Sequence, residues 1–171
     1  VKDNVVAPLA PVTTDGSLAD LPARNATEAG GETAFSRKTP SGGWTHITWS
    51  QFAADVTAVA KGLVAEGVQP GDRVALMSRT RYEWTLVDFA AWSAGAVVVP
   101  IYETSSAEQV QWILSDSDAR LAVVETEAHR SVVEQVRGDL PSLRDVITID
   151  GGGLDALREK GRDVSDADLE A

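Results

Sequence analysis

The residues best suited to chemistry are the hydroxyl side chains of Thr104, Ser105 and Ser106, which follow an entirely apolar segment at residues 96–101. A strand that is apolar on both faces must be covered on both, so we expect residues 96–101 to form a central strand of a parallel sheet. Ligands of such sheets bind beyond the carboxyl ends of the strands. Hydroxyl groups and free amides at a helix start there could bind a phosphate or a carboxylate. Ordinary capping of the next helix by Ser105, in a capping box with Glu108, is the competing interpretation.

Motifs that would identify a nucleotide site or a metal site are missing from the sequence. Neither GxxxxGK[ST] nor GxGxxG occurs at a predicted strand-to-helix turn. Three consecutive glycines, at residues 151–153, follow the last predicted strand, and we interpret them as a flexible linker rather than a phosphate loop. The chain has no cysteine, and His46 and His129 have no partner at metal-ligand spacing, so no metal site is predicted.

The composition indicates one domain and limits its partners. The 171 residues are 43% hydrophobic, which is ample for a core. A formal net charge of -11, with 15 scattered basic residues, argues against nucleic acid as a partner. There is no run of about 18 apolar residues, so no membrane span is expected, and the first ten residues lack the pattern of a signal peptide. We therefore expect a cytoplasmic protein.

The first part of the chain predicts an arm, a hairpin and a helix. Prolines and glycines without periodicity indicate an extended arm at residues 1–31, with at most a short helical turn near residues 18–25. Residues 33–38 and 44–49 alternate as the strands of an antiparallel hairpin. A helix that Ser50 could cap follows, and its apolar face is formed by Phe52, Val56, Val59 and Leu63.

From residue 73 onwards, predicted strands and helices alternate. The strands are expected at residues 73–78, 96–101, 120–124 and 145–149. Arg79 and Arg81 flank the end of the first of these strands and are interpreted as solvated side chains. The alternation is typical of an α/β fold with a doubly wound, mostly parallel sheet. We assign this subdomain to residues 32–150, and we expect residues 151–171 to be a Gly-rich linker and an acidic tail leading into a further domain.

Several segments in register resemble one enzyme superfamily. Residues 47–52 (ITWSQF) and 93–101 (SAGAVVVPI) resemble the first two core motifs of the adenylate-forming, AMP-binding synthetases, in the same order and at a similar separation. Four further segments look like the long-chain fatty acid–CoA ligase branch. These are residues 17–21 (SLADL), 34–38 (AFSRK), 81–84 (RYEW) and 101–106 (IYETSS).

The resemblance implies an activity and a set of substrates. Such ligases use ATP and Mg²⁺ to convert a fatty acid into an acyl-adenylate with release of pyrophosphate, and then transfer the acyl group to coenzyme A. The family's Ser/Thr/Gly-rich phosphate loop with its Lys, its later adenylate motifs and its C-terminal lid lie downstream of the segments matched here. We therefore expect an inactive amino-terminal portion of such an enzyme, and no catalytic residue is assigned.

Two alternatives stay open at this stage. The chain could be a free-standing, non-enzymatic α/β binding or interaction module that shares only the topology. It could also belong to an adenylate-forming ligase for another carboxylic acid, because chain length rests on the resemblance alone. If a larger protein normally covers this domain, Trp84, Trp92 and Trp112 are candidates for exposure, and a homodimer is then expected.

Overall fold

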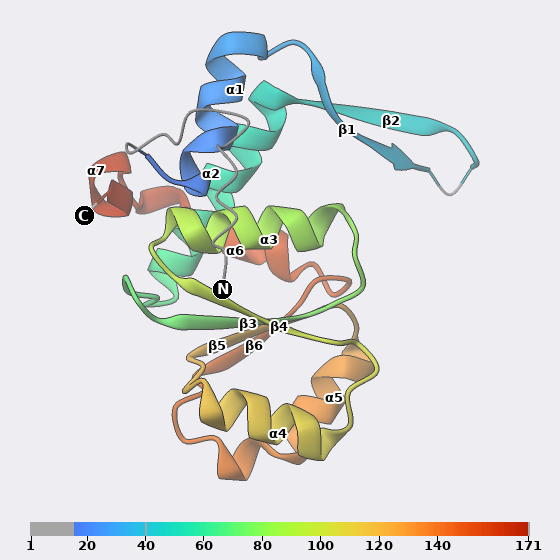
Figure 1. The fold of residues 1–171 in the computed structure, drawn as a ribbon, viewed down its shortest axis with the longest axis vertical. Coiled ribbons are helices and arrows are strands. Elements are labelled where there is room, and N and C mark those ends of the chain that lie inside the picture. The colour runs from blue at the N-terminus through green and yellow to red at the C-terminus, as the bar shows by residue number, and fades with distance from the viewer. Residues whose placement is uncertain (1–15, 40, 171) are drawn as a thin grey trace, which may run out of the picture.

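The computed structural model describes residues 16–39 and 41–170 as a three-layer α/β domain with a projecting hairpin (Figure 1). The four-stranded sheet has the order β4-β3-β5-β6, and every neighbouring pair is parallel. Its strands are β3 (Arg73–Met77), β4 (Val97–Ile101), β5 (Leu121–Val124) and β6 (Asp145–Thr148). The predicted doubly wound α/β fold is therefore confirmed.

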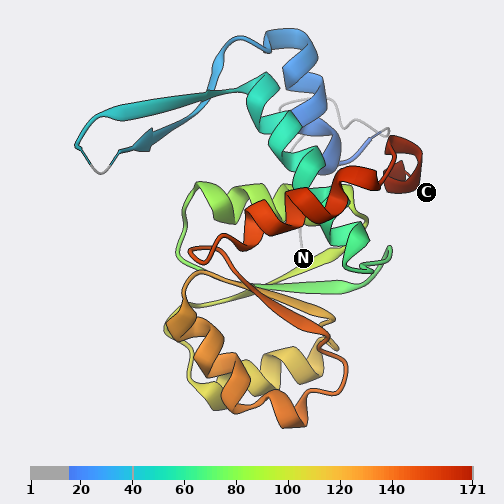
Figure 2. The same cartoon turned by 180° about the vertical axis from the view of Figure 1, so that it is seen from behind.

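Helices cover both faces of this sheet (Figures 1 and 2). One face carries α2 (Trp49–Ala65), α3 (Tyr82–Ser93) and α6 (Gly153–Lys160), and the other carries α4 (Ala107–Asp116) and α5 (Glu127–Gln135). Each face has its own apolar cluster, because alternate residues of each strand point to opposite sides. The α2 face is apolar as predicted, and its central residues are fully buried: Phe52, Val56, Val59 and Leu63.

The antiparallel hairpin consists of β1 (Thr33–Lys38) and β2 (Trp44–Thr48), as predicted. Helix α2 begins directly after it. Thr48 caps this helix by accepting a hydrogen bond from the amide of Gln51, whose side chain accepts one from the Thr48 amide. The predicted cap at Ser50 is wrong, because this reciprocal pair fixes the helix start two residues earlier.

The segment before the hairpin is helical where the structure describes it. A short 3₁₀ turn, η1 (Leu18–Asp20), leads into α1 (Leu21–Ala29), so the helical turn predicted near residues 18–25 is present but is longer than predicted. Ser17 and Asp20 form a capping box, and Pro22 lies in the first turn of α1, where its missing N–H is not needed. Residues 1–15 of the predicted arm lie outside the described residues.

Strand β4 is the edge strand of the described sheet, so the prediction of a central position is wrong. Its two faces are covered as expected, since Val98 packs on one apolar cluster and Val99 on the other. The amide of Val97 donates to Asp72 beside β3, and the alternation of the strand turns the nitrogen of Pro100 outward. Proline has no N–H to donate, so it suits an edge position.

Residues 151–170 form part of the packed domain, so the prediction of a flexible linker and tail is wrong. Leu154 and Leu157 of α6 are buried against the sheet and α2. The 3₁₀ turn η3 (Gly161–Asp163) and helix α7 (Asp166–Glu170) follow, and Lys61 of α2 pairs with Asp166 at 2.7 Å. The remaining described helix is the 3₁₀ turn η2 (Arg137–Asp139) after α5.

Close packing of α2 on α6 predicts that Gly62→Ala destabilises the fold. A Cβ atom at Gly62 would lie 2.3 Å from the Leu157 carbonyl oxygen, so the backbones must separate. We expect the free energy of unfolding to fall by about 1–3 kcal/mol, measured by urea denaturation. Gly138→Ala is the control, because a Cβ there meets nothing within 4 Å. Stabilisation of Gly62→Ala by about 1 kcal/mol, as helix propensity alone would give, would show that α6 does not pack on α2.

Candidate functional site

The predicted turn at residues 104–106 caps helix α4. The Ser105 amide donates to the Tyr102 carbonyl at 3.0 Å, which closes the turn. Ser106 is the N-cap, because its hydroxyl accepts from the Gln109 amide at 3.3 Å and its own amide donates to Gln109 Oε1 at 2.9 Å. The prediction that Ser105 is the cap, with Glu108 completing the box, is wrong by one residue.

An open hollow of about 1140 Å³ lies beside this turn along α4. Tyr102 and Trp112, which are 82% and 66% exposed, contribute aromatic surface to it, and Ser105 and Ser106 contribute hydroxyl groups. Thr104 is exposed but does not line the hollow. The arrangement offers a surface for contact rather than a reactive centre, because it brings no acid–base pair together with the hydroxyl groups.

The assignment of the cap predicts different effects for the two serines. Ser106→Ala removes the acceptor for the Gln109 amide, so we expect a loss of about 1 kcal/mol in the free energy of unfolding. Ser105→Ala, the matched control, should change it by less than about 0.5 kcal/mol. Denaturant unfolding of both variants measures the difference, and a larger loss for Ser105→Ala would return the cap to Ser105.

The sheet itself identifies a second location for a site. The chain leaves β3 for α3 on one face and leaves β5 for α5 on the opposite face, although β3 and β5 are neighbours. Connections that diverge in this way open a crevice at the carboxyl ends of the two strands, which is the usual ligand position in open α/β sheets. Ser78 and Arg79 follow β3 there, and Glu125 follows β5.

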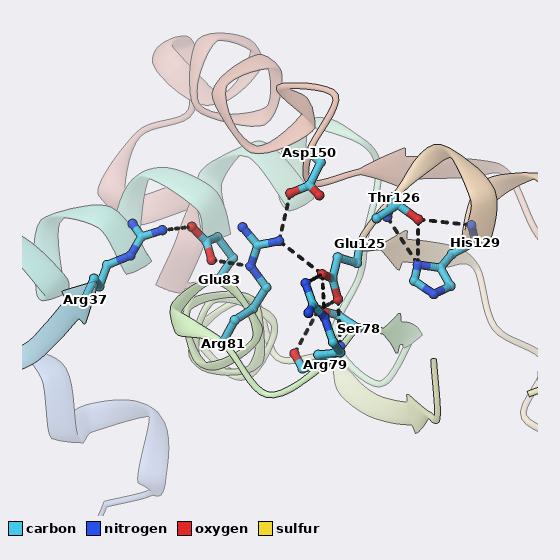
Figure 3. Close-up of polar contacts among 9 residues, drawn as sticks. All are labelled: Arg37, Ser78, Arg79, Arg81, Glu83, Glu125, Thr126, His129 and Asp150. Atoms are coloured by element: carbon cyan, nitrogen blue, oxygen red, sulfur yellow. Dashed lines mark hydrogen bonds and ion pairs between the residues drawn. The ribbon is translucent and has the colours of Figure 1, made fainter. Parts of the chain in front are cut away.

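Glu125 is the centre of a hydrogen-bonded cluster at this crevice (Figure 3). Its side chain is 1% exposed. One carboxylate oxygen accepts from the Arg79 amide at 2.9 Å and from the Ser78 hydroxyl at 3.2 Å. The other accepts from Arg79 Nε at 2.9 Å, from Arg79 Nη2 at 2.5 Å and from Arg81 Nη1 at 3.5 Å. A buried carboxylate needs such partners, because desolvation of an unpaired charge is costly.

Arg81 extends this cluster to three more elements (Figure 3). Its Nη1 donates to Asp150, just after β6, at 2.7 Å, and its Nε donates to Glu83 in the first turn of α3 at 2.6 Å. Glu83 also accepts from Arg37 of the hairpin. Three arginines and three carboxylates therefore tie together the ends of β3, β5 and β6, the start of α3 and strand β1.

The cluster shifts the pKa values of Glu125 and Glu83 toward their charged forms. The hydrogen bond from the Arg79 side chain lowers the pKa of Glu125 to about 2 against the opposing effect of burial, and the Arg79 amide and the Ser78 hydroxyl add to the lowering. Burial opposes the charge of Glu83, but hydrogen bonding from Arg81 lowers the pKa of that carboxyl. Both carboxylates are therefore charged at neutral pH.

Sequence reasoning did not identify this cluster. Arg79 and Arg81 were noticed only as solvated neighbours of a strand end, whereas both are held by ion pairs. The available signal was a carboxylate, Glu125, directly after the apolar residues 121–124. Two arginines, Arg79 and Arg81, follow another predicted strand, at residues 73–78. That signal requires the strand order, which the sequence does not give.

The two histidines serve local structure. His129 completes the capping box of α5, since its amide donates to the Thr126 hydroxyl and its Nδ1 lies 3.3 Å from the Thr126 amide (Figure 3). His46 Nδ1 lies 2.9 Å from the Ser36 hydroxyl across the hairpin. Within residues 16–39 and 41–170, no three His, Cys, Asp or Glu side chains are grouped so as to hold a metal ion.

The buried cluster predicts a pH-dependent cost for Glu125→Gln. The pKa of Glu125 falls from 4.5 to about 2 on folding, so its stabilising effect is complete above pH 4.5 and is lost as the pH falls toward 2. At pH 7 we expect the free energy of unfolding of the variant to be about 1–3 kcal/mol lower than that of wild type. The range allows for solvent screening at exposed Arg79. The difference from wild type should shrink between pH 4.5 and 2.

Denaturant unfolding at several pH values measures this difference. Glu159→Gln is the control, because Glu159 is 66% exposed and pairs with exposed Arg162. A Glu125→Gln variant as stable as wild type at pH 7 would contradict the central role of the carboxylate.

Comparisons with known proteins agree with this fold. The structure defines a doubly wound α/β domain with a polar cluster where its connections diverge. Residues 22–170 match the AMP-binding enzyme family, so the chain belongs to that family.

Three similar proteins place the chain within it. The long-chain-fatty-acid–CoA ligase FadD15 of Mycobacterium bovis is 50% identical over 133 residues, which are 76% of this chain and 22% of that protein. The uncharacterized protein Rv1549 of Mycobacterium tuberculosis is 32% identical over 118 residues, which are 69% of this chain and 65% of that protein. The crystal structure of the anthranilate CoA ligase AuaEII with anthranoyl-AMP has 27% identity and a TM-score of 0.73, and the match covers 82% of this chain and 26% of that one. The chain thus spans about a fifth of the ligase FadD15.

No helix in the described part of the chain is both long enough and apolar enough to cross a membrane.

Proposed function

We propose that this chain is part of an ATP-dependent long-chain fatty acid–CoA ligase. The observation that carries the proposal is the 50% identity to the ligase FadD15 over 76% of the chain. In the proposed reaction, a fatty acid and ATP form an acyl-adenylate and pyrophosphate, and the acyl group then passes to coenzyme A with release of AMP. The full enzyme would use Mg²⁺ with ATP, and the proposal assigns no Mg²⁺ ligand to the described residues.

The chain's own contribution is the structural wall of the substrate cleft rather than the reacting groups. Residues 104–106 and the Glu125 cluster both follow the carboxyl ends of parallel strands, where ligands of such sheets bind. We propose that Thr104, Ser105 and Ser106 line the side approached by coenzyme A or the fatty acid. The hydroxyl of Ser106 already accepts the Gln109 amide, so it would contact a ligand only as a second partner.

A homodimer and a cytoplasmic location are further parts of the proposal. Trp112 is 66% exposed beside Tyr102, which gives α4 an aromatic surface available to a partner. Trp84 is partly buried against the apolar cluster, and the Trp92 ring lies 5.1 Å from that of Phe89. Among the three tryptophans predicted to lose cover, Trp112 therefore supports a contact surface best.

Two observations favour alternatives. Rv1549 is matched over 65% of its length, so a related segment can make up most of a protein, which favours a free-standing α/β module. The anthranilate ligase shares the fold at a TM-score of 0.73, so a ligase for another carboxylic acid is the second alternative. The acid that the enzyme uses distinguishes the proposal from the second alternative. The capacity of the chain to support catalysis distinguishes the proposal from the first alternative.

A chimera tests the proposed function. The chain replaces the corresponding segment of FadD15, and acyl-CoA formation is measured with palmitate, ATP, Mg²⁺ and coenzyme A. We expect the chimera to form palmitoyl-CoA at a rate within about tenfold of FadD15, because a homologous scaffold should preserve the orientation of the reacting groups. The 171-residue chain alone should form none, because stabilisation of the transferring group requires positioned cations and amides from the rest of the enzyme.

The outcomes separate the candidates. A folded chimera without activity would favour the free-standing module, and activity with benzoate or anthranilate but not palmitate would favour another acid. Acyl-CoA formed by the isolated chain would contradict the scaffold role. In the active chimera, Ser106→Ala should raise the KM for coenzyme A if the turn contacts it, whereas a cap alone leaves the kinetics unchanged.

A further inference from the structure

Arg79 combines two properties that rarely occur together. Its side chain is 69% exposed, yet its Nε and Nη2 are both held by a carboxylate that is 1% exposed. No described residue accepts a hydrogen bond from its Nη1, so one edge of the planar guanidinium faces outward. The carboxylate is buried and the guanidinium is exposed, so a cationic group reaches the surface at this point.

The need to satisfy Glu125 accounts for only part of this arrangement, because the Arg79 side chain is one of several donors to that carboxylate. The carboxylate also receives hydrogen bonds from the Arg79 amide, the Ser78 hydroxyl and Arg81. Immobilising an exposed arginine costs up to about 2 kcal/mol of side-chain entropy, which the ion pair with the buried carboxylate has to offset. A fixed guanidinium is useful where it binds an oxyanion. Its fork geometry suits phosphate, and a side chain that is already fixed loses less conformational entropy on binding.

The position of Arg79 in the fold also supports a contact with a ligand, and this argument does not depend on how the side chain is held. Arg79 follows β3 and Glu125 follows β5, at the crevice where the connections diverge to α3 and α5. Figure 3 shows the two side chains meeting there, with Thr126 and the start of α5 beside them. Strand β4, which precedes the turn at residues 104–106, lies at the sheet edge and does not border this crevice.

We propose that Arg79 binds a phosphate group of a nucleotide substrate at the crevice between β3 and β5, and that Glu125 is the positioning residue that orients it. The proposal rests on the proposed function in one respect, because that function supplies two phosphate-bearing nucleotides, ATP and coenzyme A. Both present the same chemistry to a guanidinium, and binding experiments distinguish them.

Titration of the 171-residue chain, followed by NMR, tests the site. The probes are inorganic pyrophosphate for the shared group, ATP and coenzyme A for the source, and adenosine as the uncharged control. We expect a saturable shift of the Arg79 Nε–Hε signal and of the amides near residues 78 and 125 with pyrophosphate and with one of the two nucleotides. Arg79→Gln should weaken that binding by about tenfold or more, and Arg79→Lys by less, because lysine keeps the charge but not the fork.

Matched variants keep the test decisive. Arg162→Gln should leave binding unchanged, since Arg162 is 73% exposed and pairs with a carboxylate that is itself 66% exposed. Glu125→Gln should weaken binding although Arg79 is retained, which an unspecific charge effect would not produce. Equal binding by wild type and Arg79→Gln, or no response of the wild-type Arg79 signal to any phosphate probe, would overturn the proposal.

The failure of this inference is distinguishable from failure of the proposed function. An active FadD15 chimera together with an unresponsive Arg79 would reject the site and keep the ligase. Pyrophosphate binding that depends on Arg79, together with an inactive chimera, would keep the site and reject the ligase.

Discussion

The buried carboxylate of Glu125 is the interaction on which the rest of the carboxyl edge depends. Removing an unpaired carboxylate from water costs several kcal/mol, so Glu125 is tolerated only because two arginines, a backbone amide and a hydroxyl surround it. Those donors come from the residues after β3, and Arg81 continues to Asp150 after β6 and to Glu83 of α3. One buried charge thereby fixes the relative positions of three strand ends and a helix start.

These ion pairs and hydrogen bonds matter because they lie where the connections after β3 and β5 diverge to opposite faces of the sheet. Helices α3 and α5 leave neighbouring strands toward opposite faces, and a crevice between diverging loops would otherwise be the least constrained part of the sheet. The ion pairs convert it into a fixed surface whose central carboxylate stays charged near neutrality, since the pKa of Glu125 is lowered to about 2. Such a surface suits binding and orientation.

Much of the fold was predictable from periodicity and turn residues, because these report local geometry. The apolar face of α2 was predicted correctly. Gly67 and Gly95, whose φ angles of 85° and 70° are left-handed, follow the ends of α2 and α3. The errors concern features that depend on neighbours. Apolarity of β4 correctly indicated that both faces are covered, but it carries no information about the hydrogen-bonding edge, so the edge position was missed. Helix α6 was missed because Gly151, Gly152 and Gly153 resemble a linker, although a Cβ at Gly153 would meet Thr148 backbone at 2.6 Å and the close packing requires glycine there.

The site was harder to predict than the fold for the same reason. Residues 104–106 are contiguous, so their hydroxyl groups were visible in the sequence, and the capping box was misplaced by only one residue. Arg79 and Glu125 are separated by 46 positions and meet only because β5 lies beside β3 rather than beside β4. Membership of the AMP-binding enzyme family does not say which arginine is immobilised or what holds it. That information lies in the pairing of two parallel strands, where a carboxylate too buried to be solvated holds the guanidinium above it in a fixed orientation.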